Sequence, residues 1–423
     1  MIEIFGTMFL LMFLGVPIYY VLAGACVVYF GVNGIPIWTV IQRQFTGLNT
    51  FVQVAIPMFI LAGNLMDAGG ALDRIVKFAQ ATVGRFKGGM AHVNILASMM
   101  FAGVTGSAVA DVAALGPLEI EMMTSQGYEK DYATSVTVAS ACIGPIIPPS
   151  LPLIMFGVVS GTSVGALLMA GAIPGVVMGL ALMLQVVYVA HKYNLPTSEA
   201  FPFKEMVKTF LPAVSAMSIV IIVLGGIYSG FFTPTEAAGV ACLVAFLLGK
   251  FVDKNLKWRD IPGILVKTAS TLGTCSAIFA VASCFSYAIT FENIPAKIAA
   301  ALLSISTNKY VLLLLVNVML LVIGCFMEGL SAVMIVTPML LPALVKVGVD
   351  PIQVGVIFAV NTTLGLLTPP FGLSLFMASS ITDLPVLKIA RKIMPQFIVL
   401  LICLLLFTFV PAFSTFLPHF MLG

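Results

Sequence analysis

Two long apolar stretches of the sequence are each interrupted by a pair of prolines. The first interruption lies in Ser140-Ala-Cys-Ile-Gly-Pro-Ile-Ile-Pro-Pro-Ser150, and the second lies in Asn361-Thr-Thr-Leu-Gly-Leu-Leu-Thr-Pro-Pro370. Proline lacks a backbone donor and clashes with the preceding turn, so a helix must unwind at each place. At bilayer depth, unwound backbone occurs only where protein or a water-filled cavity supplies its hydrogen bonds. Its freed carbonyl groups are ligands for a hard cation such as Na⁺.

Two further apolar stretches, 90–125 and 309–346, are interrupted near their middle. The first interruption is Gly103-Val-Thr-Gly-Ser107, and the second is Met327-Glu-Gly329. A new helix begins after each interruption, and its unpaired N–H groups and helix dipole favour an anion there. Each tip, together with one broken helix, would therefore form a paired cation and anion site.

Polar side chains near the tips and the breaks are the candidate ligands. Thr105 and Ser107 can add hydroxyl oxygens to a first ion site, and Thr368 can do so in a second, unless these hydroxyls bond to their own helices. Glu328 lies at the second tip, where an acidic side chain costs a few kcal/mol unless it is functional or hydrated. We predict substrate contacts from Ser107, Asp111, Glu328, Asn361 and Thr362, although Asp111 also suits a helix start and the last two also suit helix packing.

The composition excludes a soluble domain of any size. Sixty per cent of the 423 residues are hydrophobic and only 9% are charged, whereas soluble domains carry about 25% charged residues. Mean hydropathy is +1.13. Crossing a bilayer takes about 20 apolar residues. We predict an all-α integral membrane protein whose spans lie near 3–14, 17–32, 51–67, 131–160, 163–190, 210–229, 233–250, 268–290, 351–380 and 394–416.

The placement of lysine and arginine indicates that the stretches 90–125 and 309–346 are re-entrant hairpins rather than crossings. With the N-terminus outside and neither hairpin crossing, every Lys and Arg lies inside except Arg43, Lys297, Lys309 and Lys346. This bias follows the positive-inside rule, and letting either hairpin cross would scatter later basic clusters to the wrong side. Both termini are therefore predicted to lie outside.

The sequence contains an internal repeat with an offset of 221 residues. At this offset Gly144 aligns with Gly365, Pro148-Pro149 with Pro369-Pro370, and Ser107 with Glu328. Glycine and proline dictate backbone breaks, so the repeat preserves backbone shape. Each half has five predicted spans, an odd number, so the second copy is inverted relative to the first. We divide the chain into 1–209, with hairpin 90–125 and broken helix 131–160, and 210–423, with hairpin 309–346 and broken helix 351–380.

Two other patterns bear on the chemistry. Gly161-Thr-Ser-Val-Gly165 fits the nucleophile elbow of serine hydrolases, but that elbow needs a strand-to-helix turn and a histidine partner. A membrane-embedded hydrolase built on Ser163 is therefore a remote alternative, and we predict that the chain is not an enzyme. No chain of histidines and carboxylates runs through the spans as a proton relay would require, so coupling to Na⁺ is favoured over coupling to H⁺.

Four motifs together resemble the large membrane subunit of tripartite ATP-independent periplasmic (TRAP) transporters, which belong to the ion transporter superfamily. They are the tip from Gly103 to Asp111, the break Gly144-Pro-Ile-Ile-Pro-Pro-Ser150, the turn Phe232-Thr-Pro-Thr-Glu236, and Leu367-Thr-Pro-Pro-Phe-Gly372. The resemblance covers essentially the whole chain. It implies an elevator mechanism in the bacterial inner membrane and Na⁺-driven import of carboxylates, in the sialic acid or C4-dicarboxylate class.

The resemblance also implies partners and ion ligands. The partners would be a small four-helix membrane subunit on a separate chain and a periplasmic substrate-binding protein, with the lipid bilayer around them and no nucleic acid. A stand-alone Na⁺/carboxylate symporter of the same superfamily is the alternative. The implied Na⁺ ligands are Thr105, Ser107, Gly144, Ile147 and Pro149 in the first half and, by the repeat, Phe326, Glu328, Gly365, Thr368 and Pro370 in the second.

Overall fold

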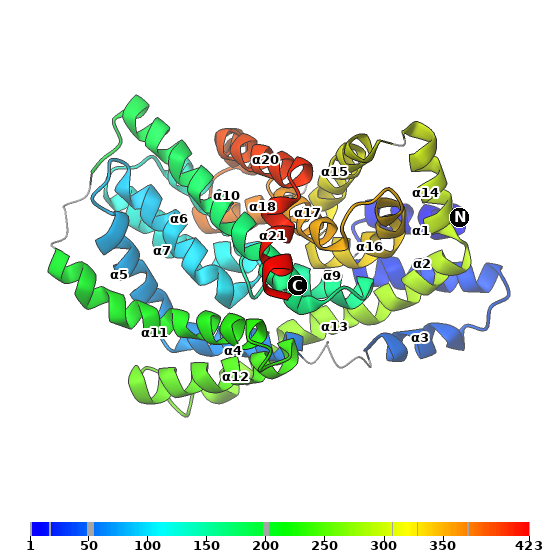
Figure 1. Ribbon diagram of the computed structural model, residues 1–423, viewed down its shortest axis with the longest axis horizontal. Coiled ribbons are helices and arrows are strands. Elements are labelled where there is room, and N and C mark those ends of the chain that lie inside the picture. The colour runs from blue at the N-terminus through cyan, green and yellow to red at the C-terminus, as the bar shows by residue number, and fades with distance from the viewer. Residues whose placement is uncertain are drawn as a thin grey trace.

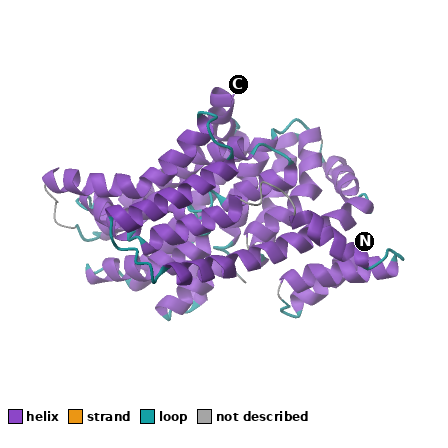
Figure 2. Cartoon of the chain, turned by 90° about the horizontal axis from the view of Figure 1, so that it is seen from below, coloured by secondary structure: helices purple, strands orange, loops and turns teal. Residues whose placement is uncertain are grey.

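The protein is described by a computed structural model. The structure describes residues 2–16, 18–48, 55–197, 203–306, 308–327, 329–369 and 372–422. Throughout these ranges the chain is helical and connected by turns and short loops, with an isolated β-bridge between Lys87 and Thr197. Figure 2 shows this helical architecture. The predicted all-α class is therefore confirmed.

The described residues of the first half of the chain form ten helices. They are α1 (Ile2–Phe13), α2 (Ile18–Val32), α3 (Trp38–Leu48), α4 (Ala55–Ala68), α5 (Ala71–Val83), α6 (Gly89–Thr105), α7 (Ala108–Ser125), α8 (Lys130–Ala141), α9 (Leu151–Ser160) and α10 (Val164–Tyr193).

The second half continues with α11 (Phe203–Tyr228), α12 (Pro234–Leu247) and a π-helical turn, η2 (Leu248–Val252). It then contains α13 (Ile261–Phe291), α14 (Ile294–Ile305), α15 (Lys309–Phe326), α16 (Gly329–Lys346), α17 (Pro351–Gly365), α18 (Leu373–Thr382), α19 (Val386–Lys392), α20 (Met394–Phe409) and α21 (Ala412–Leu422).

The predicted interruptions all occur, and one is shorter than expected. Helix α6 continues through Thr105, so only Gly106 and Ser107 separate it from α7, whereas we predicted a break from Gly103 to Ser107. Gly106 adopts a left-handed conformation with φ of 59°, and its N–H donates to Ala102 O. Glycine tolerates this conformation without strain, which lets the helix end abruptly. The double prolines separate α8 from α9 and α17 from α18 as predicted.

The last predicted span, 394–416, contains a bend. Helix α20 ends at Phe409, α21 begins at Ala412, and the two helices are bent by 54°. Pro411 cannot donate a backbone hydrogen bond and restricts the residue before it, so the helix ends there. The sequence also gave no sign of α3, a short helix that carries polar residues among its apolar ones and packs on α13. The predicted boundary at residue 210 falls inside α11.

Several helices have the length and composition of membrane spans. Val164–Tyr193, Pro234–Val252 and Gly329–Lys346 are each long and apolar enough by themselves, and the number rises to seven if each of four bent pairs forms one span. The last of the three is α16, which the sequence assigns to a re-entrant hairpin, so its depth in the bilayer stays a prediction. Ten crossings likewise stay a prediction.

The hairpins and broken helices pack together in the middle of the molecule. Helix α15 packs along α17, α6 packs against α8, and α9 lies against both α16 and α17 (Figure 1). Helices α11 and α12 lie along one edge, next to α4 and α5. The termini of the two broken helices are thus surrounded by helices from both halves of the chain.

A glycine pair permits the closest approach in this group. A Cβ atom added at Gly324 of α15 would lie 3.0 Å from the Cα of Gly365 in α17 and 3.0 Å from Thr362 O. Only glycine leaves room for backbones this close. Substituting either residue must push the hairpin arm away from the broken helix.

We therefore predict that Gly365→Ala lowers stability by about 1–3 kcal/mol, the usual effect of overpacking a tight contact. Gly239→Ala is the matched control, because it also lies in a helix but nothing lies within 4 Å of its added Cβ. The measurement is the thermal unfolding midpoint of each purified variant in detergent. Equal midpoints for the two variants would show that the close contact does not exist.

Candidate functional site

The first hairpin tip lies against the first broken helix. A Cβ atom added at Gly106 would lie 3.0 Å from Leu151 Cγ and 3.5 Å from Leu151 N, at the start of α9. Ser107 is the N-cap of α7 in an extended conformation, and its hydroxyl does not cap the helix. The tip therefore brings the predicted ligand Ser107 to the N-terminus of α9. The backbone of Thr105 ends α6 beside it.

The first break is a tight series of turns rather than an open loop. Gly144 N–H donates to Ala141 O at 3.1 Å, and Ile147 N–H donates to Ile143 O at 3.1 Å. Ser150 caps α9, because its hydroxyl accepts from Leu153 N–H at 3.3 Å and also donates to Pro145 O. The cis peptide bond between Pro148 and Pro149 lies in this segment.

Two glycines of α10 let this break pack closely on a neighbouring helix. A side chain at Gly171 would collide with the carbonyl oxygen of Ile146, and one at Gly175 would collide with the side chain of Ile147. The backbone of the break is therefore held between α10 and the tip. Carbonyl groups in such a segment are the type of ligand that Na⁺ binds.

The second tip contacts the second break in the same manner. Cys325 Sγ lies 2.7 Å from Thr368 Oγ1, and the Thr368 hydroxyl also donates to Gly365 O at 2.7 Å. A Cβ atom at Gly329, the first residue of α16, would lie 3.2 Å from Thr362 Oγ1. Phe326 ends α15 nearby. Glu328 and Pro370, both predicted ligands, lie outside the described residues.

The two breaks come together at the centre of the molecule. Cys142 Sγ, just after α8, donates to Thr363 O in α17 at 3.7 Å. The rings of Phe156 and Phe358 pack edge to face, with their centroids 5.6 Å apart. The end of α8 and the end of α17, which precede the two breaks, therefore meet in one central region.

Asn361 and Thr362 are buried and are largely engaged within the helices. Asn361 Nδ2 donates to Asn317 Oδ1 at 2.8 Å, which ties α17 to α15, while Asn361 Oδ1 has no hydrogen-bond partner among the described residues. Thr362 Oγ1 donates to Phe358 O at 2.9 Å. Hydrogen bonds within and between the helices therefore occupy most of the polar groups of these two residues. Asn361 Oδ1 is the polar atom that is available to a ligand. Asp111 is also buried, in the first turn of α7.

Sequence reasoning missed Glu119, which is fully buried in the middle of α7. Its carboxylate lies near the Thr137 hydroxyl and the carboxyl group of Asp111, without a hydrogen bond of good geometry among the described residues. Close by in the fold, α6 and α8 are joined by a buried polar cluster, in which Asn94 Nδ2 donates to Thr137 Oγ1 at 2.6 Å and Ser140 Oγ donates to Asn94 Oδ1 at 2.7 Å. The sequence does contain a signal for Glu119, because an ionisable residue inside an apolar stretch indicates a functional position.

Ser163 does not form a nucleophile elbow. It lies in the turn between α9 and α10, where its hydroxyl accepts from Ala166 N–H at 3.3 Å and caps α10. The elbow of serine hydrolases requires a strand before the serine, and here a helix precedes it. The hydroxyl therefore has a structural role at this position.

Comparison with known proteins decides the family. Residues 5–413 match the model of the tripartite ATP-independent periplasmic transporter, DctM component. The chain belongs to this family. It is therefore the large membrane subunit of a TRAP transporter, a multi-pass protein of the inner membrane and not an enzyme, as the motifs predicted.

Several relatives of this TRAP subunit have known names. It is 39% identical to the sialic acid TRAP transporter large permease protein SiaM of Vibrio cholerae, over 90% of each chain. It is 35% identical to the C4-dicarboxylate TRAP transporter large permease protein DctM of Rhodobacter capsulatus, over 98% of each chain. It is 38% identical to the isethionate TRAP transporter permease protein DctMQ of Oleidesulfovibrio alaskensis, and that match covers 98% of this chain and 65% of the relative.

Solved structures resemble the TRAP subunit in fold. The YdaH transporter of Alcanivorax borkumensis superposes with a TM-score of 0.61, covering 91% of this chain and 89% of that one at 16% identity. MtrF of Neisseria gonorrhoeae superposes with a TM-score of 0.58 at 14% identity, covering 87% and 83% of the two chains. At these identities the likeness concerns the fold alone.

We predict that Glu119→Gln leaves the thermal midpoint of the purified subunit unchanged or raises it. Replacing a buried ionisable group with a neutral one of similar shape removes a desolvation cost, and the amide can keep the contact with Thr137. Glu119→Lys should instead prevent folding, because burying an ammonium group in this packed region carries a large desolvation cost. A large loss of stability in the glutamine variant would contradict this prediction and would show that the carboxylate holds a cation.

Proposed function

We propose that this subunit imports organic carboxylates with Na⁺ by an elevator mechanism. One observation carries the proposal: each hairpin tip contacts the break of its own half, as at Gly106 with Leu151 and at Cys325 with Thr368, and the two breaks meet at Cys142 and Thr363. Tips and breaks are where helix ends and freed carbonyl groups concentrate. A site of this kind suits an anion bound beside cations.

An inverted repeat is the proposed architecture, and the helix boundaries support it. Both ends of α16 lie 221 residues after those of α7, and Gly127 and Gly348 share a left-handed conformation at the same offset. The packing is reciprocal, since α9 contacts α17 and α16 while α18 contacts α8 and α7. The hydrogen bond from Cys142 to Thr363 joins two residues 221 apart, as happens near an axis that relates two copies.

The proposed moving body comprises the hairpins α6–α7 and α15–α16 and the broken helices α8–α9 and α17–α18. These elements contact one another extensively, so they can move as one unit. The proposed scaffold is built from the outer helices, including α11 and α12. Displacement of the moving body across the membrane would carry the central site from one side to the other.

In the proposed cation sites, Na⁺ binds backbone and hydroxyl oxygens of the tips and breaks. The first site uses Thr105, Ser107 and the carbonyl groups of Gly144, Ile147 and Pro149. The second uses the corresponding positions, namely Phe326, Glu328, Gly365, Thr368 and Pro370. Thr368 is partly buried and lies against Cys325 at the tip, so its hydroxyl can contact an ion between tip and break.

The proposed substrate is an organic carboxylate. Relatives are named for sialic acid and for C4-dicarboxylates, and another is named for isethionate. All are organic anions, which suits helix N-termini at Ser107 and Gly329. The proposed contacts come from Ser107, Asp111, Glu328, Asn361 and Thr362.

The proposed partners are a small four-helix membrane subunit and a periplasmic binding protein that delivers the substrate. The family model and the names of the large permease relatives support this arrangement. The distribution of lysine and arginine supports placing both termini in the periplasm.

Uptake into proteoliposomes tests the proposal. We expect labelled sialic acid or succinate to enter vesicles that hold this subunit and its small partner only when the cognate binding protein and an inward Na⁺ gradient are both supplied. Replacing Na⁺ with choline should abolish uptake. Gradient-driven uptake without the binding protein would favour a stand-alone symporter. Uptake at the same rate with and without Na⁺ would contradict coupling to Na⁺.

Thr368→Val tests the second cation site. Loss of one hydroxyl ligand should raise the Na⁺ concentration for half-maximal uptake by about tenfold while leaving the thermal midpoint nearly unchanged. Thr271→Val is the matched control, because Thr271 bonds to its own helix at 3.1 Å on an exposed face of α13. An identical dependence of uptake on Na⁺ concentration in the two variants would show that Thr368 is not a Na⁺ ligand.

A further inference from the structure

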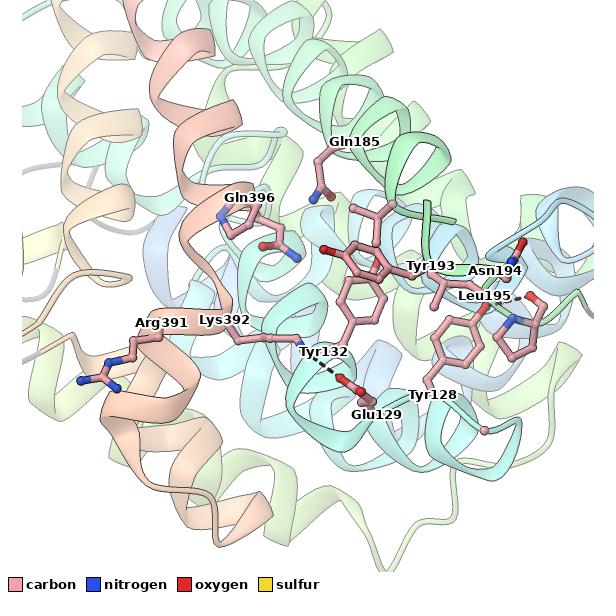
Figure 3. A pocket seen from close by; sticks show the side chains of 14 residues that line it. Tyr128, Glu129, Tyr132, Gln185, Tyr193, Asn194, Leu195, Arg391, Lys392 and Gln396 are labelled. Atoms are coloured by element: carbon pink, nitrogen blue, oxygen red, sulfur yellow. Dashed lines mark hydrogen bonds and ion pairs between the residues drawn. The ribbon is translucent and has the colours of Figure 1, made fainter. Parts of the chain in front are cut away.

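A cavity of about 640 Å³ lies away from the central site, where the loop before α8 meets the end of α10 and the start of α20. Figure 3 shows its lining, which comes from three separate parts of the chain. Tyr128, Tyr132 and Tyr193 form aromatic walls, and Gln185 and Gln396 add side-chain amides. None of the proposed cation or substrate ligands lines this cavity. It is therefore separate from the site proposed above.

Two polar atoms in the cavity wall lack hydrogen-bond partners among the described residues. Tyr132 is only 7% exposed, yet its hydroxyl has no hydrogen-bond partner in the described part of the chain, and the same holds for Gln185 Oε1. The amides of Gln185 and Gln396 point toward the middle of the cavity (Figure 3). Leaving buried polar groups unpaired is unfavourable. A ligand with hydroxyl groups would satisfy them.

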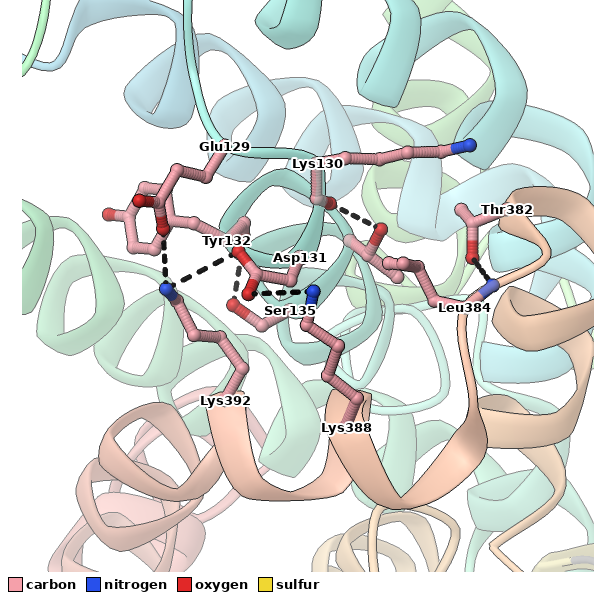
Figure 4. A network of polar contacts seen from close by, with 10 residues as sticks. Glu129, Lys130, Asp131, Tyr132, Ser135, Thr382, Leu384, Lys388 and Lys392 are labelled. Carbon is pink, nitrogen blue, oxygen red and sulfur yellow. Dashed lines mark hydrogen bonds and ion pairs between the residues drawn. The ribbon is translucent and has the colours of Figure 1, made fainter.

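Lys392, which lines the cavity, belongs to a network of charged side chains shown in Figure 4. Lys392 Nζ donates to Glu129 Oε2 at 2.7 Å and lies 3.3 Å from Asp131, while Lys388 lies 3.6 Å from Asp131. Burial alone would lower the pKa of Lys392, but its hydrogen bonds to Glu129 and Asp131 raise it, so the ammonium stays charged. Arg391 also lines the cavity and is exposed. The border carries an excess of positive charge, which favours an anion.

The outer face of α10 beside the cavity has side chains typical of a membrane boundary. Tyr188 and Tyr193 are 65% and 66% exposed, and Lys192 lies over both rings at 5.8 and 5.5 Å. Exposed tyrosines beside lysine are typical of the boundary between lipid and water. One turn earlier Leu184 is 71% exposed, as expected on the hydrocarbon side. Lipid headgroups are the molecules that occupy this depth.

We propose that this cavity binds the headgroup of an anionic glycerophospholipid. Its phosphate would lie against Arg391 and Lys392, the free hydroxyls of a glycerol headgroup, as in phosphatidylglycerol, would bond to Gln185 and Tyr132, and its acyl chains would follow the apolar outer face of α10. Basic pockets between membrane helices bind anionic headgroups by this combination of charge and hydrogen bonds. A bound lipid would join α10 to α19 and α20.

Native mass spectrometry of the full chain in detergent micelles tests the proposal. We expect the wild-type chain to retain phosphatidylglycerol in preference to phosphatidylcholine. Tyr132→Phe and Gln185→Leu should each weaken that retention about fivefold, the usual effect of one lost hydrogen bond, and Arg391→Gln should reduce the preference for the anionic lipid. Tyr188→Phe is the matched control, because Tyr188 lies at the same boundary outside the cavity, and it should retain the lipid as the wild type does.

Among the described residues, the groups that these two variants remove have no hydrogen-bond partner. The variants should therefore fold normally, and a thermal midpoint for each checks this. Equal retention of both lipids by the wild type, or unchanged retention by Tyr132→Phe and Gln185→Leu, would overturn the proposal. Titration with glycerol 3-phosphate distinguishes a membrane lipid from a soluble phosphate ester as the ligand. Binding of this soluble anion in the cavity without any binding of phosphatidylglycerol would also overturn the assignment to lipid.

Discussion

Backbone polar groups at the helix breaks must find partners where water is scarce, and the rest of the structure depends on that constraint. At the first break, turns occupy the N–H groups of Gly144 and Ile147, and Ser150 caps the next helix. Glycines of α10 and the tip at Gly106 then close around the segment. Because the break is enclosed by protein in this way, its carbonyl groups can be directed at a small bound ion.

Buried polar contacts fasten each broken helix to the first arm of its own hairpin. Ser140 in α8 bonds to Asn94 in α6, and Asn361 in α17 bonds to Asn317 in α15. Such bonds are directional and few alternatives exist in an apolar surrounding, so they fix the register of the packed helices. A hairpin and a broken helix joined in this way suit movement as one body, which the proposed elevator requires.

Charged groups behave differently at the ends of the helices. Lys388 and Lys392 meet Glu129 and Asp131 near the start of α8, which joins the second half of the chain to the first. The neighbouring cavity combines polar atoms that lack partners among the described residues with basic groups at its border. In the two proposals above, the buried centre therefore holds small ions and substrate, while the positive charge at this border contacts lipid headgroups.

The sequence by itself determined the helical membrane class, the family, the hairpins and both double-proline breaks, because hydropathy and backbone breakers are local properties of the chain. Tertiary structure alone decided which breaks and tips meet, since the contact between Cys142 and Thr363 joins residues far apart in sequence. It also decided that Asn361 is mostly engaged in packing and that Glu119 is fully buried. These depend on how helices from distant segments pack, and no local pattern encodes that arrangement.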